Sequence, residues 1–179
     1  MTTPWTTLRR LAADTRGSEI AEAAAVLPLM FMVLLGIFWF GQAYTIYGAI
    51  TRAAQEGARA GAASICATCG TDTLPQHFAN ATNATQTALL ASKLDPTKAR
   101  VPSAPPAFTV CAGGLVSCNV TNNYCVQAPV HMTKAAGNTG ACGISVSLQY
   151  PFQFWLPFTS LNKQQIWISS AALERLESQ

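Results

Sequence analysis

The sequence predicts an α+β protein, in which a long N-terminal helix packs on a small antiparallel sheet domain that disulfides stabilise. Two observations carry this prediction. Residues 23–40 read AAAVLPLMFMVLLGIFWF, an apolar run of the length that membrane-spanning helices need. All six cysteines lie after this run, in a region with proline-rich and glycine-rich loops and alternating strand patterns.

The residues before the apolar run predict how the helix is oriented. Residues 1–17 form a short basic leader that includes Arg9, Arg10 and Arg16. Because Lys and Arg concentrate on the cytoplasmic side of membrane helices, we expect a cytoplasmic N-terminus and an exported C-terminal region. A secretory signal peptide is the closest alternative, but its apolar region is shorter and precedes its cleavage site. We therefore expect a retained membrane segment at about residues 23–43.

The helical pattern extends well beyond the membrane segment, from Ser18 to about Ser64. Apolar and small residues recur at helical spacing in its later part, which predicts an amphipathic continuation of the same helix. Gly57 and Gly61 form a GxxxG pair, which permits a close helix approach, although a plain small-residue core face explains them equally well. Pro28 lies inside the apolar run and removes one backbone donor. It is either a tolerated kink or a local weakening used in packing or extraction.

Residues 65–179 are expected to form the exported α+β domain. A second helix is predicted at Pro75–Leu94, capped by Thr73 or Asp72. The clearest strand is Ile144–Tyr150, which alternates apolar and polar residues. The remaining predicted strands are the short segments Phe108–Cys111 and Tyr124–Gln127, and Gln165–Ala171, which is placed to pair antiparallel with residues 144–150.

The six cysteines are candidates for structural disulfides, because an even number confined to the exported side suits an oxidising compartment. They are Cys66, Cys69, Cys111, Cys118, Cys125 and Cys142, and their 15 pairings remain open. A redox-active Cys66-x-x-Cys69 is the alternative, but this pair follows a helix C-terminus, where the helix dipole opposes thiolate formation. No second CxxC completes a metal site, and His77 and His131 are isolated from each other in the sequence.

Composition and motifs favour a protein without catalytic activity. No Ser/His/Asp set, paired acids or glycine-rich phosphate loop can be assembled from the sequence, so we expect no catalytic residues, no cofactor and no metal. The net charge of +3 is small and no basic-aromatic patch accompanies it, which argues against nucleic acid as a partner.

The segment Arg16–Glu22 is the strongest candidate for a functional site. A glycine lets an extended backbone approach a protease closely, and a cut after Gly17 would leave Ser18 as the new N-terminus. Glu22 would then be the fifth residue of the mature chain. An unpaired carboxylate is costly in lipid, so pairing with the amine of a neighbouring subunit would favour assembly in register. Alternatively, Glu19 and Glu22 are first-turn acids that complement the helix dipole, an interpretation that suffices for Glu19.

These residues resemble type IV prepilins, and most closely the TadE-like minor pseudopilins of the tight-adherence (Flp) pilus. The resemblance rests on Arg16-Gly17, on Glu22 and on Val26-Leu27-Pro28-Leu29. Residues 54–59 are similar to a downstream Ala-Arg-Glu-Gly-Ala-Arg block of that family. Two positions depart from the pattern: Ala23 stands where an aromatic residue often follows the glutamate, and Gln55 replaces the usual Arg. The similarity is good over residues 9–62 and loose over 144–175.

The resemblance implies a pilin-like fold, and cleavage after Gly17 by an aspartic prepilin peptidase on the cytoplasmic side. It also implies other pilin or pseudopilin subunits, the inner-membrane pilus assembly platform and membrane lipid as partners. The expected location is the bacterial inner membrane, with a single pass and an exported C-terminal domain. Incorporation into the filament, a place at its cap and a role as a membrane-bound assembly factor all remain open.

Two other functions stay as alternatives. One is a single-pass anchored domain that binds an extracytoplasmic ligand and does not polymerise. The other is an envelope thiol oxidoreductase that uses Cys66 and Cys69.

Overall fold

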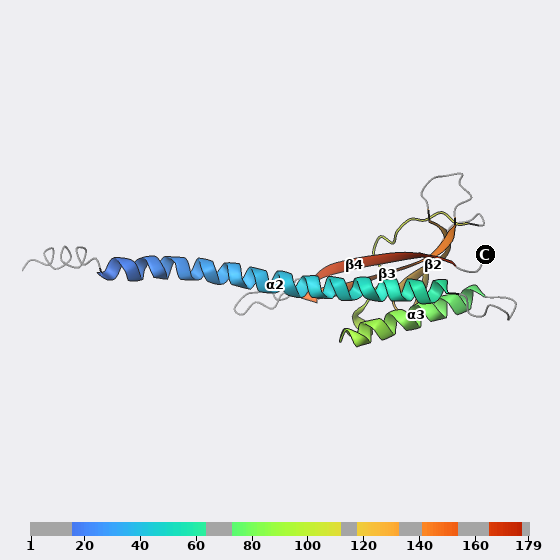
Figure 1. The fold of residues 1–179 in the computed structure, drawn as a ribbon, viewed down its shortest axis with the longest axis horizontal. Coiled ribbons are helices and arrows are strands. Elements are labelled where there is room, and N and C mark those ends of the chain that lie inside the picture. Colours follow the sequence, from blue (N-terminus) through green and yellow to red (C-terminus); the bar gives the residue numbers. More distant parts are fainter. Residues whose placement is uncertain (1–15, 64–72, 112–117, 133–140, 154–164, 177–179) are drawn as a thin grey trace, which may run out of the picture. The chain divides into compact units, whose positions relative to one another are not determined.

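The computed structural model describes residues 16–63, 73–111, 118–132, 141–153 and 165–176 (Figure 1). These residues form helices and an antiparallel sheet, which confirms the predicted α+β class. The chain divides into two compact units, unit 1 at Met1–Gln42 and unit 2 at Ala43–Gln179. The elements in chain order are α2 (Arg16–Ala62), α3 (Leu74–Ala91), the 3-10 helix η1 (Pro96–Lys98), β1 (Asn119–Thr121), β2 (Tyr124–His131), β3 (Cys142–Gln153) and β4 (Gln165–Arg175).

The long helix α2 closely matches the predicted helical segment. It begins at Arg16, two residues before the expected start, and ends at Ala62. Pro28 lies inside it without ending it. In unit 2 the later part of α2 runs beside α3, as Figure 1 shows.

The second helix, α3, begins where the sequence predicts and ends earlier. Thr73 is its N-cap, and the Thr73 backbone N–H donates to the side-chain oxygen of Gln76 at 3.3 Å. After Ala91 the chain turns back through Lys93, whose φ is 59°, in the left-handed region. The Lys93 N–H donates to the Leu90 carbonyl and the Leu94 N–H to the Leu89 carbonyl, at 2.9 Å each. This is the hydrogen-bond pattern of a Schellman motif, so the predicted end at Leu94 is three residues too late.

All four strands are antiparallel, in the order β1-β2-β3-β4. The predicted pairing of the last two strands is confirmed, with Tyr150 opposite Ile168. Three predicted strands were too short, because β2 continues to His131, β3 covers Cys142–Gln153 and β4 reaches Arg175. The strand predicted at Phe108–Cys111 is reduced to a bridge between Val110 and Val130.

One face of β3 supplies the core of unit 2. Ile144, Val146, Leu148 and Tyr150 are all buried, as their alternation predicts. They contribute to two hydrophobic clusters. The Ile50 cluster consists of Ile50, Ala53, Ala54, Leu89, Ala99, Tyr124, Leu148 and Tyr150. The Ala58 cluster consists of Ala58, Ala62, Ala81, Val126, Cys142, Ile144, Val146 and Leu176.

Candidate functional site

The apolar part of α2 is exposed in the described structure. Among the described residues, one helix is long and apolar enough to cross a membrane, at Ile20–Ala62 with a mean hydropathy of 2.4 in its most apolar window. No residue of that window is buried within the chain. A core helix of a soluble domain would bury much of such a surface, so this segment is compatible with single-pass membrane anchoring.

The predicted processing site lies at the start of this helix. Gly17 and Ser18 belong to the first turn of α2 and not to an extended segment before it. Ser18 and Glu22 are four residues apart, which puts both positions on one face of the helix, about 6 Å apart along its axis. The Glu22 side chain is exposed, and no described residue forms an ion pair with it.

The block Ala54–Arg59 packs α2 onto its own chain. Ala54 and Ala58 are fully buried, and a methyl group added at Gly57 would collide with the Thr85 hydroxyl of α3. A methyl group at Gly61 would lie 2.9 Å from the Ala81 side chain of the same helix. The GxxxG pair therefore serves close packing of α2 on α3 within unit 2.

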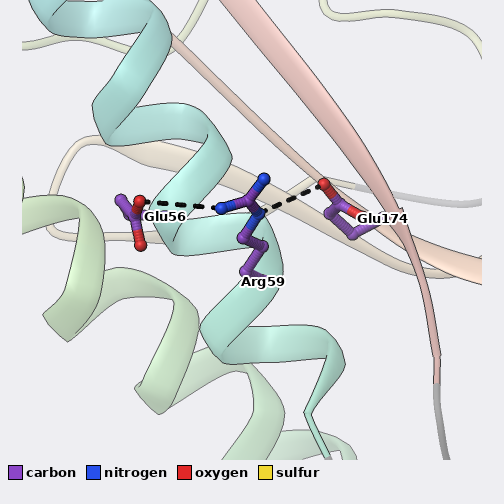
Figure 2. Close-up of polar contacts among 3 residues, drawn as sticks. All are labelled: Glu56, Arg59 and Glu174. Atoms are coloured by element: carbon purple, nitrogen blue, oxygen red, sulfur yellow. Dashed lines mark ion pairs between the residues drawn. The ribbon is translucent and has the colours of Figure 1, made fainter.

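The same block places one cation between two acids. Figure 2 shows Arg59 reaching Glu56 on its own helix and Glu174 on β4, with N–O distances of 4.0 and 3.7 Å. The Arg59 side chain is 65% exposed, so water screens both pairs. Contacts of this kind typically contribute less than about 1 kcal/mol to stability. The Arg59–Glu174 pair joins α2 to β4, as does a 3.2 Å hydrogen bond from the Ser170 hydroxyl to that of Thr51.

His77 is buried and has a hydrogen-bond partner. Its Nδ1 atom lies 2.7 Å from the carbonyl oxygen of Gly61, in the last turn of α2. Carbonyls in the last turn of a helix lack intrahelical donors, and a histidine N–H supplies one here. This role of His77 could not be predicted from the sequence, because the two residues lie on different helices.

Four of the six cysteines are described, and they form two disulfides, Cys111–Cys142 and Cys118–Cys125. His131 Nδ1 lies 3.6 Å from the Cys111 sulfur. Cys66 and Cys69 lie outside the described residues. Within the described ranges, no three His, Cys, Asp or Glu side chains gather as a metal site would require.

These features define an α+β protein whose long N-terminal helix combines a membrane-length apolar segment with a packed amphipathic one. A model of the TadE-like protein family matches residues 17–59, the segment that contains both parts of that helix. The match confirms the predicted resemblance to TadE-like proteins, and this family suggests involvement in Tad pilus systems. No curated protein and no solved structure matches the chain.

Proposed function

We propose that this chain is a minor pseudopilin of a Tad (Flp) pilus, cut after Gly17 by a prepilin peptidase and acting in pilus assembly or structure. The observation that carries the proposal is the position of Glu22, on the uncovered apolar helix and five residues beyond Gly17, within the family match. The role is structural, and the partners are other pilin subunits, the assembly platform and membrane lipid.

The Glu22 carboxylate has a specific part in this proposal. A charge on an apolar helix is costly in lipid unless a partner neutralises it. Cleavage after Gly17 creates an amine at Ser18, one helical turn from Glu22 of the same chain. In a bundle of such helices, the amine of one subunit pairs with Glu22 of the next and fixes their relative register. Without cleavage, that amine does not exist.

The order of charged residues and cysteines along the chain suits export of unit 2. Arg9, Arg10 and Arg16 precede the apolar segment, and both described disulfides belong to unit 2. Basic residues favour the cytoplasmic side and disulfides favour an oxidising compartment. We infer that the N-terminus is cytoplasmic and that unit 2 lies outside the inner membrane.

The cleavage is tested by intact-mass measurement of the protein purified from its native cells. The proposal predicts loss of residues 1–17 in the wild type and a full-length chain in Gly17→Ala. Gly36→Ala is the matched control, because an added methyl group there meets no atom within 4 Å, and it is expected to be processed normally. A wild-type mass that retains residues 1–17 contradicts the proposal.

The role in the pilus is tested with Glu22→Gln, which removes the charge and keeps the side-chain size. Glu19→Gln is the control, since the helix dipole alone accounts for an acid at that position. Both variants should be cleaved, and only Glu22→Gln should abolish pilus formation or incorporation, scored by mass spectrometry of sheared pili and by surface attachment. Normal pili in a strain that lacks the protein would favour the anchored, ligand-binding alternative.

A further inference from the structure

The charged side chains of unit 2 are unevenly distributed between its two clusters. At the Ile50 cluster, Lys98 and Arg100 flank the buried Ala99, and Lys93 precedes the half-buried Leu94. Arg52 adds a further cation beside Ala53, and Asp95 is the one described acid in this group. At the Ala58 cluster the described charges balance: Glu56, Arg59, Glu174 and Arg175. The described part of unit 2 is therefore basic at one end.

Two of these cations line a cleft of about 420 Å³ between η1, β3 and β4. Its lining includes Lys98, Arg100, Tyr150, Gln153, Gln165 and Trp167. The Arg100 guanidinium lies over the Trp167 ring, 4.9 Å from its centroid. Within the described ranges, no carboxylate lies within ion-pair distance of Lys98 or Arg100. The cleft thus offers positive charge beside an aromatic ring, with amide and hydroxyl groups around it.

The backbone holds these groups in place. Arg100 and Gln149 exchange two main-chain hydrogen bonds, of 2.9 and 2.8 Å, which attach the segment after η1 to β3. The Asp95 carboxylate accepts hydrogen bonds from the Thr97 N–H and hydroxyl, at 3.0 and 2.7 Å, and so serves as the N-cap of η1. That carboxylate caps the turn that presents Lys98, and its charge offsets part of the Lys98 charge.

The cleft lies at the end of unit 2 where α2 enters it. Near the start of β3, Ile144 lies beside Gly61, which is at the end of α2. Further along β3, Leu148 and Tyr150 share a cluster with Ile50, which comes earlier in α2. Strand β3 therefore runs antiparallel to α2. Gln153 follows Tyr150 along β3, so it lies further toward Ala43, the first residue of unit 2. This end also carries exposed apolar and aromatic side chains, namely Tyr44 (76%), Tyr47 (47%) and Ile166 (49%).

We propose that this cleft binds the phosphate of an anionic phospholipid in the membrane that α2 enters. The membrane segment predicted from the sequence ends at about residue 43, so we expect lipid headgroups to lie level with the first turns of unit 2. Lys and Arg bind phosphate through charge-assisted hydrogen bonds, and Trp and Tyr favour the interface between membrane and water. The inference rests on membrane anchoring by α2, and it is independent of the role in a pilus.

The test uses the full chain reconstituted in nanodiscs of phosphatidylcholine containing a minor fraction of phosphatidylglycerol. Native mass spectrometry then measures how many phosphatidylglycerol molecules stay bound relative to phosphatidylcholine. Lys98→Gln/Arg100→Gln should lower the preference for phosphatidylglycerol by about tenfold or more, since each Lys or Arg near an anionic membrane surface strengthens binding to anionic lipid. Arg59→Gln/Arg175→Gln removes the same charge at the Ala58 cluster and should leave the preference unchanged.

Three outcomes overturn the inference: an unchanged preference in Lys98→Gln/Arg100→Gln, an equal loss in both double variants, or inorganic phosphate that displaces the lipid at low millimolar concentration. An equal loss would mean that net charge alone attracts the lipid, and displacement would mean a site for free phosphate. Circular dichroism verifies that each variant is folded, and Lys98→Gln alone provides a milder change. A chain that does not insert into the nanodiscs would contradict membrane anchoring by α2, on which the inference rests. The test does not depend on processing after Gly17.

Discussion

The Nδ1 atom of His77 donates a hydrogen bond of 2.7 Å to the carbonyl oxygen of Gly61, and this bond joins the first turns of α3 to the last turn of α2. The two helices lie close together here. A methyl group on Gly61 would lie only 3.2 Å from the carbonyl oxygen of His77. The bond is buried, so water does not readily replace the imidazole if it is lost.

Replacing His77 with Ala should therefore destabilise unit 2. The substitution removes the donor and leaves a buried carbonyl unsatisfied, at a cost of about 1–3 kcal/mol. Denaturant unfolding of the full chain in detergent, followed by circular dichroism, measures the loss. Asn83→Ala, at an exposed position of the same helix, should change stability by less than about 0.5 kcal/mol. Equal stability of the two variants would show that the hydrogen bond contributes nothing.

Gly57→Ala should also destabilise the contact between α2 and α3. The added methyl group collides with the Thr85 hydroxyl and comes within 3.0 Å of the Ala81 carbonyl, and overpacking of this kind costs about 1–3 kcal/mol. Gly48→Ala meets no atom within 4 Å, so it should be neutral or slightly stabilising through helix propensity.

The same measurement on Gly57→Ala/Thr85→Ala gives a stricter test of that contact. Removing the Thr85 hydroxyl should restore part of the stability lost in Gly57→Ala, since the two changes meet at one place. If the losses from the two single variants simply add, the steric explanation is wrong.

The two described disulfides should differ in their contributions to stability. Cys111–Cys142 closes a loop with a sequence separation of 31, and Cys118–Cys125 one of 7. By loop-closure entropy, removal should cost about 4 kcal/mol for the longer loop and about 2 kcal/mol for the shorter. Unfolding of the Cys111→Ala/Cys142→Ala and Cys118→Ala/Cys125→Ala variants tests this order, and the reverse order would contradict it.

Tyr124 should make the folded state sensitive to alkaline pH. Burial raises its pKa to about 12, because the fully buried ring disfavours the charged phenolate. The unfolded chain releases this proton near its ordinary pKa of about 10, so this contribution to stability is complete below pH 10. It is lost as the pH rises toward 12, by up to about 2–3 kcal/mol.

Tyr124→Phe removes that dependence, and it removes a hydroxyl that has no hydrogen-bond partner among the described residues. Its unfolding free energy should fall less steeply than that of the wild type between pH 9 and 12. At neutral pH the variant should be as stable as the wild type or slightly more stable. Parallel curves for the two proteins would rule out Tyr124 as the titrating group.

Local patterns were enough to predict the elements that depend on local rules. The apolar run and the later helical spacing predicted α2, and alternation identified the buried face of β3. Thr73 was identified as one of two possible caps because threonine and aspartate both favour the N-cap position and Pro75 suits the first turn. The structure has Thr73 as the N-cap. The end of α3 was misplaced because Lys93, rather than a glycine, adopts the left-handed conformation.

Features that depend on distant segments could not be read from the sequence. Strand β2 brings Cys111 and Cys142 together, because it lies between them. On one side Val130 forms a bridge with Val110, the residue before Cys111, and on the other side His131 pairs with Cys142. Strand β2 was expected to end at Gln127, two residues before Pro129. It continues because the register shifts between Gln127 and Val130, where a proline is tolerated. The basic cleft likewise draws its residues from η1, β3 and β4, with no local signal.

The packing of Gly57 and Gly61 against α3 restricts how this protein can meet its neighbours. At these two positions α2 is narrow enough for another backbone to come close, and α3 already occupies them. A second copy could use this stripe only by displacing α3. In the proposed pilus, we therefore expect subunit contacts through the uncovered apolar part of α2, where Glu22 and Pro28 lie. Mutations that disrupt folding should then map to the stretch around Gly57 and Gly61, and those that disrupt assembly to the apolar stretch.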